Sequence, residues 1–269
     1  ARCRKDQPSD LYVALLNEID RCLTARQLGA KIVFLAYVDL LWAPRHERIA
    51  NPSRFILMFA PITRSYTRPF SAKRGGPAEA IMPFRRNRLK FPSTPDANLR
   101  LFAGWKRAFR GDRVDFDYHL WRDWINDPGQ MQLARVIHAD ARALGRLGMN
   151  GFISCQAQRV AFPTGLHMHL LGRALWDRRP SFERLATEYF GDVFGADGPA
   201  VRRYLDTLSA LFDPSFLRGE KKDSAAREKA RRRLMRIPGV VRAIGGTIAS
   251  GCRSRDPVAA AAWRILRHH

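Results

Sequence analysis

Strand-like segments alternate with helical segments over most of the first half of the chain, and this alternation limits the possible folds more than any other feature. Four segments have the length and apolar content of strands, and they cover residues 31–40, 54–62, 113–124 and 151–160. Helical spacing precedes the first strand and recurs between the second, third and fourth, at 9–28, 97–109 and 128–147. Strands that alternate with helices predict a parallel sheet with crossover connections.

Polar side chains mark the end of every expected strand: Tyr37 and Asp39, Thr63 and Arg64, Asp117 and His119, Gln156 and Gln158. In a (βα)8 barrel, the catalytic residues lie at the carboxyl ends of the strands. Such a barrel needs eight strands, so we expect an α/β chain that forms the second half of a TIM-barrel-like fold, with about four parallel strands. An open α/β sheet is the alternative.

Helical spacing continues almost without interruption after Pro163. We therefore predict a β/α half-barrel over 1–165, closing helices over 166–215, and a basic helical tail over 216–269. Between the second strand and the helix at 97–109 lies a stretch rich in Arg, Gly and Pro, from Thr63 to Thr94, which is expected to be a long irregular loop.

The third strand carries apolar side chains on one face and ionisable ones on the other. Val114 and Phe116 alternate with Asp115, Asp117 and His119. Because successive side chains of a strand point to opposite faces, the two sets must separate. Val114 and Phe116 suit a helix-facing side, which predicts that the two acids and the imidazole point to the barrel axis. Buried acids are normally paired, so Asp115 is expected to contact an arginine.

Charge and composition exclude some classes of protein. The apolar runs are too short to span a membrane. The net charge of +22 suggests nucleic acid, but arginine supplies 39 of the 47 basic residues and is spread nearly evenly. Local clusters at 85–90 and 227–236 keep a polyanionic partner as an alternative. The four cysteines lack a metal or dithiol spacing, and His167 and His169 diverge on a helix, so we expect no metal and no cofactor.

Several segments resemble one known family in the same order along the chain. These are SDLYVALLNEID, KIVFLAYVDLLWAP, VDFDYHLW, LGMNGFISCQAQ and LLGRALWDRRPSFERLATEYFGDVFG. Together they resemble the domain of unknown function 4838 family, from about Cys3 to Phe212. That family is similar to α-glucuronidase-like glycoside hydrolases built on a (βα)8 barrel. The resemblance implies carbohydrate processing. It also implies a preceding acidic, cysteine-rich stretch, of which Cys3 would be the remnant, and the first barrel strands upstream.

Glycoside hydrolysis usually needs two carboxylic groups, one as acid and one as base or nucleophile. We assign these catalytic roles to Asp39 and Asp117. The expected substrate-binding residues are polar or aromatic side chains near the strand ends: Tyr37, Tyr118, His119, Trp121 and Gln156. The predicted partner is a carbohydrate, with an acidic sugar suggested by the many arginines. A carbohydrate-binding protein of the same fold that does not catalyse hydrolysis is the first alternative, and a nucleic-acid-binding protein is the second.

Overall fold

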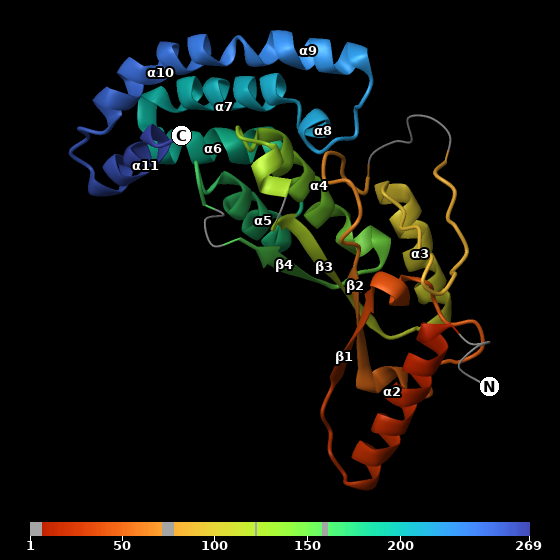
Figure 1. Ribbon diagram of the computed structural model, residues 1–269. Helices are drawn as coiled ribbons and strands as arrows, with labels where there is room; N and C mark the ends of the chain where they lie inside the picture. Colours follow the sequence, from red (N-terminus) through yellow and green to blue (C-terminus); the bar gives the residue numbers. More distant parts are fainter. Residues whose placement is uncertain (1–6, 72–77, 122, 158–160) are drawn as a thin grey trace. The chain divides into compact units, whose positions relative to one another are not determined.

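The computed structural model describes residues 7–71, 78–121, 123–157 and 161–269, and it is a mixed α/β structure (Figure 1). Its four parallel strands lie in the order β1-β2-β3-β4. The strands are β1 (Ile32–Tyr37), β2 (Phe55–Ala60), β3 (Asp112–Leu120) and β4 (Gly151–Gln156). Helix α2 (Pro8–Ala25) precedes β1, α3 (Pro95–Ala108) links β2 to β3, and α4 (Met131–Leu147) links β3 to β4. The predicted alternation and the parallel sheet are confirmed.

The chain forms two compact units. One contains residues 1–118 and 143–155, and the other contains residues 119–142 and 156–269. The chain passes from one unit to the other three times, and each passage falls inside a regular element, namely β3, α4 and β4. No connecting loop therefore separates the units at these three points.

In the first unit, the strand register determines which side chains share a face. Phe34 of β1 pairs with Leu57 of β2, and Phe59 of β2 pairs with Asp115 of β3. Because paired residues of parallel strands point to the same side, these four side chains share one face. All four are fully buried. Helices α2 and α3 pack on this face through a core that includes Val13, Leu16, Leu101, Phe102 and Trp105.

The opposite face of the sheet is apolar and incompletely covered. Val33 and Ile153 are 49% and 42% exposed, and Phe116 and Val114 are partly buried. Our expectation that Val114 and Phe116 face the helices is therefore wrong. The register puts Asp115, and with it Asp117 and His119, on the helix-covered face. The pattern of polar and apolar residues predicted correctly that the two sets of side chains lie on opposite faces of β3. It did not indicate which of the two faces the helices cover.

The second unit is helical after its share of β4, as the sequence predicts. Its helices are α5 (Leu166–Trp176), α6 (Phe182–Phe194), α7 (Gly198–Phe212), α8 (Pro214–Leu217), α9 (Ser224–Leu234), α10 (Ile237–Gly251) and α11 (Pro257–Arg267). The basic tail packs on the rest of this unit, because Ile244, Ile248 and Trp263 join Phe190 and Leu205 in one buried cluster. Within the described part of the chain, we find no helix with the length and apolarity that crossing a bilayer requires.

Candidate functional site

Ionisable side chains occupy the buried face of β3. Asp115 and Asp117 are 0% exposed and His119 is 1% exposed. They are held there by the alternation of the strand, since their neighbours Phe116 and Tyr118 point to the other side. Buried charged groups need nearby partners, because the desolvation of an unpaired ion is costly. The partners of Asp117 and His119 come from the loop after β2 and from α4.

Arg64 reaches Asp117 from the long loop that follows β2. Its Nη1 donates to Oδ2 of Asp117 at 3.2 Å, and both side chains are fully buried. The guanidinium carbon lies 3.7 Å from the ring centroid of Phe70 and 4.8 Å from that of Tyr66. The backbone N–H of Tyr118 donates to Oδ1 of Asp117 at 2.7 Å. Both oxygens of Asp117 therefore accept hydrogen bonds.

The tyrosine beside this ion pair stays protonated. Burial raises the pKa of Tyr66 well above its ordinary value, and the negative charges of Asp117 and Asp115 raise it further. The positive charge of Arg64 lowers the pKa of Tyr66, but by less than burial and the two acids raise it. The phenol is therefore a neutral group at physiological pH, and its function here is packing and hydrogen bonding.

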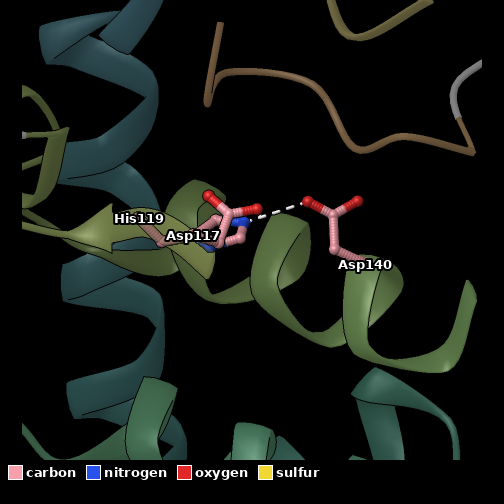
Figure 2. Close-up of side chains that lie close together, drawn as sticks. All are labelled: Asp117, His119 and Asp140. Atoms are coloured by element: carbon pink, nitrogen blue, oxygen red, sulfur yellow. Dashed lines mark hydrogen bonds and ion pairs between the residues drawn. The ribbon is translucent and has the colours of Figure 1, made fainter. Parts of the chain in front are cut away.

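His119 contacts a carboxylate from the next helix. Its Nε2 lies 2.9 Å from Oδ2 of Asp140, which is fully buried in α4 (Figure 2). Asp117, two residues earlier on the same face of β3, completes a group of three side chains. One potential ligand atom from each lies within 4.8 Å of the other two. Figure 2 shows the Asp117 and His119 side chains projecting from the strand, with Asp140 facing them from the helix.

Asp140 is the member of this group that our sequence reasoning missed. It lies on the buried stripe of α4, seven residues after Leu133, three after Ile137 and four before Leu144, all of which are buried. An acid at a position where helical spacing demands an apolar residue indicates a buried polar partner. That signal was available in the sequence.

Two of the predicted substrate-binding residues meet on the open face of the sheet. The rings of Tyr37 and Tyr118 stack, with centroids 6.5 Å apart and an interplanar angle of 24°. Tyr37 is partly buried and Tyr118 is 9% exposed. Burial raises the pKa of Tyr118, and the neighbouring Tyr37 and Cys155 raise it further. Both strands present these rings near their carboxyl ends.

Asp39 lies outside the strand in which we expected it. β1 ends at Tyr37, and Asp39 belongs to the short 3-10 helix η1 (Val38–Leu41). The chain turns at Val38, whose φ of 52° is unusual for a β-branched residue. Such outliers cost free energy and gather at functional sites. Asp39 is partly buried.

The remaining predicted residues lie in the second unit or outside the described residues. Trp121 is 43% exposed. Gln156 is exposed, and its amide nitrogen donates to the sulfur of Met168 at 3.5 Å. Cys3 and Gln158 fall on residues that the structure does not describe.

A pocket of about 310 Å³ in the first unit is rich in arginine. Arg45, Arg48, Arg100 and Arg107 line it, together with Trp42 and other residues, and no carboxylate is among the lining residues. Guanidinium groups bind carboxylates and phosphates well, so this pocket suits an anion. Sequence reasoning missed it because the four arginines come from segments more than fifty residues apart.

No protein-family model, curated protein or solved structure matches the chain. The roles of the residues described above therefore depend on their geometry alone.

Proposed function

We propose that the chain is a glycoside-hydrolase-like carbohydrate-binding protein whose sheet corresponds to four strands of a (βα)8 barrel. The observation that carries this proposal is the stacked pair Tyr37 and Tyr118, near the carboxyl ends of their strands and on the face away from the helices. In a barrel, that face points to the axis, and the carboxyl strand ends form the binding site. Aromatic rings offer flat apolar surfaces to sugar rings.

Binding is better supported than hydrolysis. Hydrolysis by the pair Asp39 and Asp117 would require both carboxyl groups to reach one sugar. Asp117 is fully buried on the helix-covered face and pairs with Arg64. Asp39 is then the one member of the predicted pair that supports a role near the tyrosines, because it follows Tyr37 by two residues. A single carboxylate near a stacked aromatic pair suits recognition of sugar hydroxyls.

Affinity measurements on soluble oligosaccharides test the tyrosine site. Tyr37→Ala is expected to weaken binding about tenfold, which corresponds to ~1.4 kcal/mol, whereas Tyr37→Phe keeps the ring and most of the affinity. Trp176→Ala is the control, because Trp176 is 92% exposed and belongs to the other unit. An unchanged affinity in Tyr37→Ala would remove the proposed site.

The arginine pocket is lined in part by α3, on the opposite side of the sheet from Tyr37 and Tyr118, and would be a second contact that favours an acidic sugar. A uronate carboxylate can accept two parallel hydrogen bonds from one guanidinium. Oligosaccharides that contain glucuronate are therefore expected to bind more tightly than their neutral counterparts, and Arg107→Gln is expected to abolish that difference. Equal affinity for acidic and neutral ligands would show that the pocket takes no part.

Turnover distinguishes the binding protein from a hydrolase. On a panel of aryl glycosides, we expect the chain to release no product above a heat-denatured control. Release that disappears in Asp39→Asn would establish a hydrolase in place of a binding protein. Release that is lost in Asp117→Asn while the fold is retained would restore the predicted carboxylate pair.

A further inference from the structure

Asp117, His119 and Asp140 have the composition of a metal site. One imidazole nitrogen and two carboxylate groups converge at the end of β3 and the middle of α4 (Figure 2). We propose that these three side chains bind a divalent transition-metal ion, for which zinc is the best match. Neither the stacked pair Tyr37 and Tyr118 nor the arginine pocket includes His119 or Asp140.

The distances suit a small ion. Zinc binds nitrogen and carboxylate oxygen at about 2.0–2.2 Å, usually with tetrahedral geometry. Two ligand atoms at such bond lengths are about 3.3 Å apart. The pair Nε2 of His119 and Oδ2 of Asp140 is 2.9 Å apart, and all three ligand atoms lie within 4.8 Å of one another. An ion can therefore enter the group with small side-chain movements.

The chemistry of the donors selects the kind of metal. Imidazole suits zinc, copper, iron and nickel, whereas magnesium and calcium prefer sites made of oxygen alone. The two carboxylates carry two negative charges, of which the one on Asp117 is already paired with Arg64. The group thus favours a transition metal of intermediate softness, such as zinc, over magnesium or calcium.

The surroundings of Asp117 resemble those of a metal-binding carboxylate. Carboxylates and imidazoles that bind metals usually form further hydrogen bonds, which fix their orientation. Asp117 accepts hydrogen bonds from the Arg64 side chain and from the Tyr118 backbone. The three ligands are at most 1% exposed.

Metal content and thermal unfolding test the proposal directly. The chain, purified without histidine tags, is dialysed against EDTA, and zinc is then added. We expect one equivalent of zinc to remain after gel filtration. The unfolding temperature should rise by about 5–10 °C when free zinc exceeds the dissociation constant a hundredfold. Magnesium should give no rise at the same concentration.

Two variants and two controls identify the ligands. His119→Gln and Asp140→Asn should lose the bound zinc and the temperature shift. His138→Gln should keep both, because His138 is not a member of the proposed group. Like His119 it is a buried histidine, but it belongs to α4, and its Nε2 lies 3.2 Å from the backbone oxygen of Pro180. His268→Gln controls for binding at the exposed histidine near the end of the chain. Zinc that binds equally well to His119→Gln would overturn the proposal.

Cobalt substitution keeps the test decisive if the variants do not fold. The parent chain loaded with cobalt(II) should show the visible absorption of a four- or five-coordinate site. It should lack the near-ultraviolet band of a cobalt–thiolate bond, since the group contains no cysteine. A thiolate band would place the metal at a cysteine, and absence of zinc from the parent would leave the His119–Asp140 pair as an ordinary buried hydrogen bond. Either result would refute the site.

Discussion

A single buried carboxylate organises the start of α2. Oδ1 of Asp10 accepts hydrogen bonds from the backbone N–H groups of His46 at 2.7 Å and Glu47 at 3.0 Å, and Oδ2 accepts one from Gln7 at 3.3 Å. Burial alone would raise the pKa of Asp10. The hydrogen bonds from Glu47, His46 and Gln7 outweigh it, so the pKa is lowered from 3.8. The ionised form therefore stabilises this unit.

Asp10→Asn is expected to lower the free energy of unfolding by about 1–3 kcal/mol at pH 7, because it removes charge-assisted hydrogen bonds from N–H groups that are buried at Gln7 and partly buried at His46 and Glu47. Since the pKa of Asp10 is lower in the folded state than in the unfolded state, its contribution is complete above pH 3.8. It is lost as the pH falls through the folded-state pKa. Urea unfolding of parent and variant at pH 7 and near pH 3 should therefore show a difference that shrinks in acid.

Asp112→Asn is the matched control for Asp10→Asn, because Asp112 is exposed in the same unit. Its effect should stay within about 0.5 kcal/mol. If Asp10→Asn changes stability no more than Asp112→Asn does, the hydrogen bonds at the start of α2 do not hold the loop that contains His46.

The contact between two helices of the second unit depends on the absence of one side chain. Gly129 precedes α4, and a Cβ there would collide with the backbone of α7 at Leu205 and Ser209. Oγ of Ser209 donates to Asp127 at 2.5 Å and accepts from the N–H of Met131 at 3.0 Å, which fixes this close approach. The start of α4 therefore lies directly against α7.

Gly129→Ala is expected to destabilise the protein by about 1–3 kcal/mol, because the added methyl group forces the two backbones apart. Gly172→Ala, in the exposed part of α5, is the control. Nothing lies within 4 Å of its Cβ position, and alanine there should stabilise the helix by about 0.5–1 kcal/mol. Thermal unfolding of both variants measures the difference. Equal effects of the two substitutions would mean that α4 and α7 can separate at no cost.

The elements of the sheet could be predicted from the sequence, but the face of β3 that the helices cover could not. Length and apolar content located all four strands, since these features depend on local residues. The choice of covered face depended on Arg64 and Asp140, which lie 53 residues before Asp117 and 21 residues after His119. These distant partners make the acidic face the buried one. Asp39 was misplaced for a local reason, because the turn at Val38 is not coded by Gly or Pro.

At the scale of the whole molecule, the dominant property is a net charge of +22. The cluster in α9 is partly neutralised by neighbouring acids. Arg231 pairs with Glu228, and Arg233 pairs with Asp213, both at 3.0 Å. We therefore expect attraction to polyanions to follow total charge and not this cluster.

Retention on heparin tests that expectation. Neutralising Arg231, Arg232 and Arg233 to glutamine should lower the eluting salt concentration by the same amount as neutralising three scattered exposed arginines, Arg203, Arg242 and Arg264. A much larger effect of the α9 triple variant would support the nucleic-acid hypothesis. The same comparison on DNA, at several salt concentrations, would measure how many phosphates the cluster contacts.

The three passages of the chain between the units have a practical consequence. Each lies within a strand or a helix, where the peptide is protected by its hydrogen bonds. Proteases cut exposed, mobile segments, so they should find no site at these borders. Truncation also cannot yield either half intact, because any cut there removes part of a strand or helix that the other half needs. The two units should therefore be expressed together, and fusions or insertions should be placed away from these borders in β3, α4 and β4.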